Sequence, residues 1–162
     1  MILARTHLDL HNVRSSIERT KKLSDNVIGV GPFGVGLDAA LNLVPGAGSL
    51  YSFLAGMLLI YDGVRARAEP MILVQMGGIL AVDTIAPLAG NLGKIADVLF
   101  TGHKWAADML LKHMEETIYF EGAREDALNT AEYRDLMARV RAGKEKRRVV
   151  FLGKSPRKPK VA

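Results

Sequence analysis

Apolar positions dominate the middle of the chain, and the stretch from Leu23 to Gly93 carries two basic residues, Arg65 and Arg67. Within this stretch, an apolar run that contains one Asp is broken by Pro and Gly and then resumes as another apolar run. The pattern occurs twice, over residues 37–48 and 82–93. Because Pro stops an incoming helix and Gly permits the chain to reverse, the repeat predicts two helical hairpins.

The lengths of the apolar runs set the predicted legs of these hairpins. The first hairpin is predicted to have a short leg over residues 33–44 and a longer leg over residues 48–66. The second is predicted to run over residues 71–86, to turn through 87–93, and to continue as an amphipathic helix from 94 to about 120. The small residues that would permit close approach of these helices are Gly56, Gly77 and Gly78.

Polar flanks enclose the apolar middle. Residues 2–22 are predicted to form an amphipathic helix, because apolar residues recur every seven positions, and residues 24–26 are predicted to break it. A charged helix is predicted over residues 125–141, followed by a basic tail that wraps a partner or pairs as one short strand. The predicted fold class is all-α, with two pseudo-repeated apolar hairpins, re-entrant or transmembrane, over residues 23–120, an N-terminal amphipathic helix in 1–22, and a charged helix with a basic tail in 121–162.

The distribution of charge favours a membrane. The formal net charge is +5, but the basic residues gather in residues 5–22 and 134–160. A soluble helical domain scatters charge over its outer faces, whereas here the middle helices lack a charged face. This segregation predicts membrane lipids and other membrane protein subunits as partners.

The short legs and the sidedness of the charges favour hairpins over spans. A span needs about 20 apolar residues, or roughly 30 Å of helix. A leg of about 11 residues rises only about 16 Å, and a hairpin that enters and returns keeps Arg65, Arg67 and both basic flanks on one side. We therefore expect two re-entrant or interfacial hairpins rather than two full spans, at the inner membrane, with both termini on its cytoplasmic side.

Asp38 and Asp83 are the charges that lie deep in the apolar runs. One interpretation is an ion or proton site, since carboxylates inside a membrane are costly. The other is structural: each carboxylate accepts hydrogen bonds from the opposite hairpin and fixes the pseudo-symmetric packing. The duplication favours the structural interpretation.

The sequence offers little for catalysis or metal binding. The absence of Cys excludes disulfides, thiolate metal sites and cysteine nucleophiles. His7 and His11 are spaced four residues apart, so both could face one metal, but the third and fourth ligands are missing. His103 and His113 have no acid or Cys at a spacing typical of a catalytic or metal site. No Ser/His/Asp arrangement, phosphate loop or dinucleotide fingerprint is present, so we expect no enzyme activity, no cofactor and no metal.

The basic C-terminal tail is a candidate binding segment. Basic tails bind nucleic acid or anionic lipid, and the position of this one beside apolar hairpins favours lipid, with a merely solvated tail as the alternative. Its basic residues are Lys144, Lys146, Arg147, Arg148, Lys154, Arg157, Lys158 and Lys160.

Several of these motifs resemble the family named domain of unknown function 4112, over roughly residues 23–111. The matching residues are Leu37, Asp38, Leu43, Val44, Pro45, Gly46 and Gly48 in the first unit, and Pro70, Asp83, Gly93 and Asp97 in the second. Ser49 and Lys94 stand where the family has an acidic residue, and Gly90 stands at the second Pro position. The resemblance implies a small helical, membrane-associated protein without an established activity. The residues predicted to fix the packing of the two hairpins are therefore Asp38, Pro45, Gly46, Gly48, Asp83, Gly93 and Asp97.

Three functions are compatible with the sequence. The leading hypothesis is a non-catalytic, membrane-associated helical protein that is an accessory or assembly subunit of a larger membrane complex. A soluble all-α interaction module is the alternative, which the mean hydropathy of +0.12 permits. The weakest is an ion or proton pathway through Asp38 and Asp83.

Overall fold

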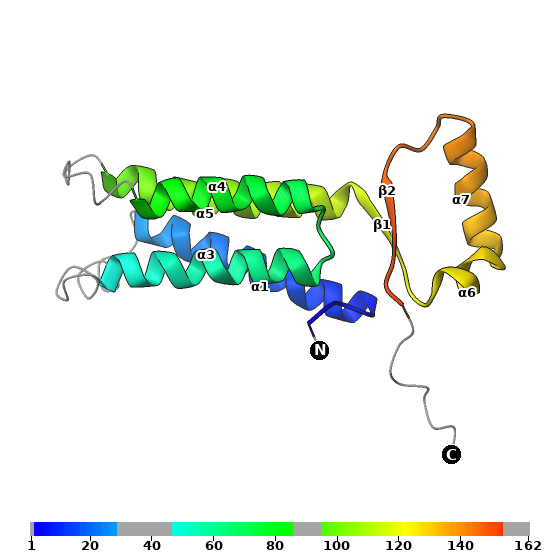
Figure 1. Cartoon of the computed structure of the whole chain (residues 1–162), viewed down its shortest axis with the longest axis horizontal. Helices are drawn as coiled ribbons and strands as arrows, with labels where there is room; N and C mark the ends of the chain where they lie inside the picture. The colour runs from blue at the N-terminus through cyan, green and yellow to red at the C-terminus, as the bar shows by residue number, and fades with distance from the viewer. Residues whose placement is uncertain (1, 29–46, 86–94, 154–162) are drawn as a thin grey trace, which may run out of the picture.

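Four long helices form an up-and-down bundle in the computed structural model, which describes residues 2–28, 47–85 and 95–153 (Figure 1). They pack as a ring, α1 on α3, α3 on α4, α4 on α5 and α5 on α1, and α5 also contacts α3 across the centre. Among the described residues, none of these helices has both the length and the apolar character needed to cross a bilayer. The helices are α1 (His7–Ile28), α3 (Ala47–Arg65), α4 (Pro70–Ile85) and α5 (Ile95–Glu115).

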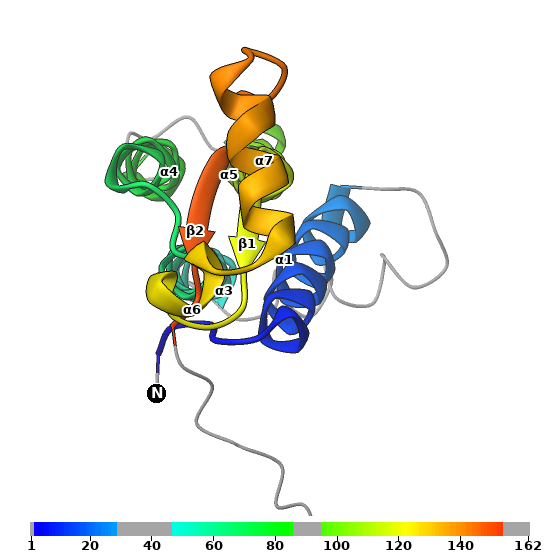
Figure 2. The same cartoon turned by 90° about the vertical axis from the view of Figure 1, so that its right-hand side faces the viewer.

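A smaller α/β unit caps one end of the bundle, and we call residues 117–153 the C-terminal module. Its two strands pair in parallel, with Thr117 opposite Arg148 and Phe120 opposite Phe151. The two-stranded ribbon lies between the end of the bundle and the two short helices (Figures 1 and 2). The elements are β1 (Thr117–Phe120), α6 (Arg124–Leu128), α7 (Ala131–Arg141) and β2 (Arg148–Phe151).

The ribbon joins two hydrophobic cores, because successive side chains of a strand point to opposite faces. Tyr119 and the fully buried Leu152 pack against the core of the bundle. Phe120 and Phe151 face the other way and stack at 5.8 Å between ring centroids, over Leu136 of α7. Fully buried side chains at the centre of the bundle include Val13, Ile17, Leu59, Met76 and Leu110.

The helices predicted over residues 48–66 and 71–86 are confirmed as α3 and α4. The short leg predicted over residues 33–44 lies outside the described residues. The predicted break at residues 24–26 is wrong, since α1 continues through it to Ile28. Ser, Asp and Asn each cost less than about 0.7 kcal/mol in a helix interior relative to Ala, too little to end a helix already under way. The same helix begins at His7 rather than at residue 2.

The C-terminal third departs further from an all-α fold. The helix predicted to reach residue 120 ends at Glu115, and the β-branched and aromatic residues that follow form β1. The predicted helix over 125–141 is two helices, because Thr130 accepts a hydrogen bond from the amide of Tyr133 and caps a new start. The basic segment does pair as one short strand, so the fold is mostly helical with two short strands.

Close helix packing involves one of the three predicted glycines, Gly56, and one that was not predicted, Gly63. A methyl group added at Gly56 would meet Leu80 and His103 at 3.5 Å, as expected of a contact position, but one added at Gly77 or Gly78 would meet nothing within 4 Å. The tightest position is Gly63, where an added methyl would lie 2.7 Å from Cδ2 of Leu73 in α4. Among the described residues, no neighbour approaches Gly77 or Gly78 closely.

Candidate functional site

Large apolar side chains cover the outer side of α3. Six of them are 42–59% exposed, and their spacing of three and four residues places them on one helical face. A soluble helix normally turns such a stripe toward the core. The six residues are Leu50, Phe53, Leu54, Met57, Leu58 and Tyr61.

The inner side of α3 is small and partly polar. Gly56 and Gly63 are buried there beside Leu59, and so is the carboxylate of Asp62, which is 0% exposed. Small residues inside and large apolar residues outside are the arrangement typical of helices that pack in lipid. The polarity of α3 is thus reversed relative to a helix of a soluble bundle.

Helix α4 continues the apolar surface beside α3. Met71, Val74 and Val82 are 64–70% exposed, and Asp83 is the one charged residue of the helix. We call these three residues, together with the six of α3, the apolar face. Helices α3 and α4 pack side by side, so the apolar face is made of exposed residues from two neighbouring helices.

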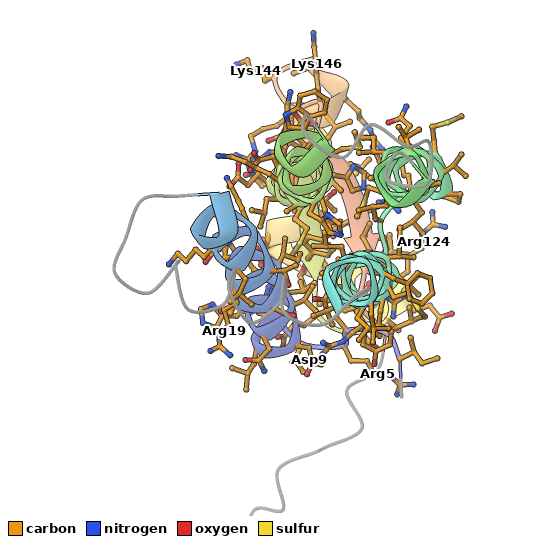
Figure 3. All side chains as sticks on the ribbon, turned by 90° about the vertical axis from the view of Figure 1, so that its left-hand side faces the viewer. Arg5, Asp9, Arg19, Arg124, Lys144 and Lys146 are labelled. Atoms are coloured by element: carbon orange, nitrogen blue, oxygen red, sulfur yellow. The ribbon has the colours of Figure 1, made fainter. Side chains whose placement is uncertain are left out.

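The opposite side of the bundle is charged. Lys21 of α1 pairs with Asp108 of α5 at 2.5 Å, and Arg14 pairs with Glu115 at 2.8 Å. Arg19 projects from α1 on the side away from α3 and α4 (Figure 3). The bundle therefore has one water-compatible side and one apolar side.

Asp62 sits in the contact between α3 and α1. Burial raises the pKa of its carboxyl group, and the Ser16 hydroxyl of α1 and the Arg65 guanidinium partly offset that effect. Arg65 Nη1 lies 3.3 Å from Oδ1 of Asp62. Since its partners in the described part of the chain are the Ser16 hydroxyl and the Arg65 guanidinium, we assign Asp62 to helix packing.

A polar junction forms where the α3–α4 connector meets the C-terminal module. Arg67 has a φ of +55°, a left-handed conformation that is uncommon outside Gly, and its Nη2 donates to the carbonyl of Leu152 at 2.7 Å. Arg148 Nη1 donates to the carbonyl of Arg67 at 2.9 Å, and the Tyr119 hydroxyl donates to that of Ala66 at 3.0 Å. The unusual backbone of Arg67 is thereby held by β2 and β1.

His113 of α5 lies at the same junction. Its Nε2 is 3.3 Å from the amide nitrogen of Glu69 and 3.0 Å from Nη1 of Arg148. Burial, and next the charge of Arg148, lower the pKa of the imidazole. Arg148 is also paired with the carboxylate of Glu69 at 3.2 Å, so all three residues form one connected group.

An open pocket of about 410 Å³ adjoins this group. Its acids already have basic partners: Glu69 pairs with Arg148, and Arg147 lowers the pKa of Glu145 to about 2 through hydrogen bonds. The described residues contain no group of three or more His, Cys, Asp or Glu arranged to hold a metal ion. The pocket is lined by Glu69, His113, Glu116, Glu145, Lys146, Arg147 and Arg148.

The sequence-predicted site residues fall in different places. Gly48 lies in the first turn of α3, Asp83 in α4 and Asp97 in α5, whereas Asp38, Pro45, Gly46 and Gly93 lie outside the described residues. Of the predicted tail, Lys144, Lys146 and Arg147 are exposed, and Arg148 is held by the junction. Lys154, Arg157, Lys158 and Lys160 lie outside the described residues.

Three residues that make important buried or long-range contacts were not predicted from the sequence. Asp62 interrupts an apolar run just as Asp38 and Asp83 do, and that pattern was the available signal for it. Arg67 and His113 carry no such signal, because their partners are 81 to 85 and 35 positions away in the chain.

Comparison with known proteins identifies the bundle. No curated protein and no solved structure matches the chain. A family model described as domain of unknown function (DUF4112) matches residues 13–114, which run from within α1 almost to the end of α5 and stop before the C-terminal module. The chain therefore belongs to the domain of unknown function (DUF4112) family.

Proposed function

We propose that this protein is a non-catalytic, membrane-associated helical protein that acts as an accessory or assembly subunit of a larger membrane complex. The observation that carries the proposal is the apolar face on α3 and α4. Large exposed apolar patches mark protein–protein or membrane interaction sites. The charged residues of the two helices are Asp62 and Arg65 in α3 and Asp83 in α4.

The size of the face supports stable membrane attachment. Removing one large apolar side chain from water contributes about 1.5–3 kcal/mol. Since the nine side chains are about half exposed, covering them would contribute on the order of 10 kcal/mol before the costs of association.

The reversed polarity of α3 favours lipid over a soluble partner. A surface that docks onto a protein carries polar groups around an apolar centre, whereas the outer positions of α3 from Leu50 to Leu58 are apolar throughout. The charged α1–α5 side would then remain in water, so the bundle would lie in the interface with one side immersed. A membrane subunit would contact the same face within the bilayer.

Vesicle flotation of the full chain tests the proposal. We expect the wild-type protein to float with phosphatidylcholine–phosphatidylglycerol vesicles, and the double variant Leu54→Glu/Met57→Glu to bind at least about tenfold less, because two charges would have to enter the apolar phase. The matched control adds the same two charges at exposed positions of α1, as His11→Glu/Asn12→Glu, and should float like the wild type.

The alternative is a soluble interaction module, which the charged α1–α5 side supports. It predicts that the wild-type chain does not float with the vesicles. A full chain that stays monomeric and soluble without detergent, and that does not float, would exclude membrane association. Loss of flotation in both double variants alike would show that added negative charge, rather than the apolar face, controls binding.

A further inference from the structure

His113 receives two hydrogen bonds on one nitrogen atom. The Glu69 amide and the Arg148 guanidinium are both obligate donors, so Nε2 of His113 must act as an acceptor toward each. An imidazole can accept at Nε2 only when it is neutral and carries its proton on Nδ1. The geometry therefore specifies both the charge and the tautomer of this ring.

The ring joins three segments that are distant in sequence. It belongs to α5, the Glu69 amide leads into α4, and Arg148 begins β2. The amide of Arg148 also donates to the carbonyl of Glu116 at 3.1 Å, the first backbone bond that attaches β2 to the end of α5. His113 thus lies where the C-terminal module is fastened to the bundle.

We propose that His113 is a pH-sensitive latch, which holds the start of β2 against the bundle while its imidazole is neutral and releases it when the ring is protonated. An imidazolium has no lone pair at Nε2. Protonation therefore removes both hydrogen bonds and places two N–H donors, Nε2 of His113 and Nη1 of Arg148, against each other with like charge.

The charges around the ring oppose one another. Arg148 disfavours the imidazolium, whereas Glu69 and Glu116 favour it, and burial, the largest effect, disfavours it. Glu69 is already paired with Arg148, and Glu116 lies 3.9 Å from the ammonium of Lys112, so both acids are partly neutralised. The other charged residues that line the adjoining pocket are Glu145, Lys146 and Arg147.

The direction of the pH effect follows from linkage. Because the latched state lowers the pKa of His113, the released state binds more protons at mildly acidic pH. The latch is complete above the ordinary histidine pKa of about 6.5. It weakens as the pH falls below that value toward the lowered pKa.

Two measurements on the wild-type full chain test the state of the ring. In nitrogen-15 NMR spectra at pH 7.5 we expect His113 to be the Nδ1–H tautomer, and in a pH titration we expect its midpoint to lie below the ordinary histidine value of about 6.5. An Nε2–H tautomer, or a midpoint at or above about 6.5, would overturn the proposal.

Amide hydrogen exchange then tests the release. Between pH 7.5 and 5, after correction for intrinsic rates, exchange of the Arg148 amide should accelerate, because protonation of His113 removes the hydrogen bonds that hold the start of β2. The variant His113→Gln keeps an acceptor but does not titrate, and it should abolish the acceleration, while His11→Gln should leave it unchanged.

In the hydrogen-exchange experiment, either of two results rejects the latch. One is an Arg148 amide whose exchange does not respond to pH in the wild type. The other is an equal response in folded His113→Gln. If that variant does not fold, the tautomer and titration of the wild-type ring decide the question.

Discussion

On the α1–α5 side of the bundle, charged side chains face outward and pair across the two helices, whereas on the α3–α4 side the outward residues are large and apolar. The contact between α1 and α5 is spanned at its surface by Arg14–Glu115 and Lys21–Asp108. The contact between α3 and α4 instead depends on Gly63, against which Leu73 packs. One bundle thus combines a side suited to water with a side suited to an apolar phase.

The largest effect should come from the inner side of α3. Leu59→Ala removes a fully buried side chain and should lower the free energy of unfolding by about 2–5 kcal/mol. Leu58→Ala, one position along and exposed, should change it by less than about 0.5 kcal/mol in lipid-free buffer. Urea denaturation of both variants gives the comparison, and an equal loss for Leu58→Ala would mean that the apolar face is covered within the protein itself.

Glycine substitutions in the α3–α4 pair should have the next largest effect. Gly63→Ala forces a methyl group against Cδ2 of Leu73, the movable end of that side chain, and should cost about 1 kcal/mol of stability, the lower end of the range for overpacking. Gly78→Ala meets no neighbour and should stabilise α4 by up to about 1 kcal/mol, because Ala is the better helix former. Thermal unfolding under one set of conditions measures both, and similar melting temperatures would show that the two helices separate easily at Gly63.

The buried carboxylate predicts a pH dependence with a definite sign. Burial raises the pKa of Asp62 in the folded state, so at neutral pH the buried negative charge lowers the stability of the fold. This cost is relieved as the pH falls through the raised pKa toward 3.8, the ordinary pKa of an Asp carboxyl group. Stability relative to Asp62→Asn should therefore increase as the pH is lowered from 7 to 4. Denaturant titrations across this range test it, with the exposed Glu132→Gln on α7 as the control substitution.

The smallest effect should come from the charged pairs of the α1–α5 side. Arg14 and its partners Glu18 and Glu115 are each 44–58% exposed, and exposed pairs contribute about 0–1 kcal/mol. Arg14→Ala should lower the free energy of unfolding by less than about 1 kcal/mol, and the loss should shrink in 1 M salt. A loss of several kcal/mol that persists in high salt would instead assign these charges a central role in stability.

Local patterning was sufficient for the long helices of the middle. The predicted legs over residues 48–66 and 71–86 correspond to α3 and α4 within one or two residues, because Pro and Gly act on their own neighbours. The same local reasoning failed at Thr117–Phe120. A four-residue apolar segment fits a helix end or a strand equally well, and the choice depends on pairing with residues 148–151.

The candidate sites divide in the same way. That residues 47–61 lack charge is visible in the sequence, but which side of α3 turns outward depends on where α1, α4 and α5 pack. His103 and His113 look alike in sequence, because neither has an acid or a Cys at a spacing typical of a catalytic or metal site. Only His113 meets Glu69 and Arg148, which the fold brings from two distant segments.

The sequence by itself determined the apolar middle, its broken helical runs and the family resemblance, because these depend on residue type and on spacing along a single helix. The tertiary structure decided that α3 turns its large side chains outward and its carboxylate inward, that the basic segment supplies a strand, and that Arg148 meets His113. Each of these depends on contacts between positions far apart in the chain, and contacts of that kind leave no periodic signal in a single sequence.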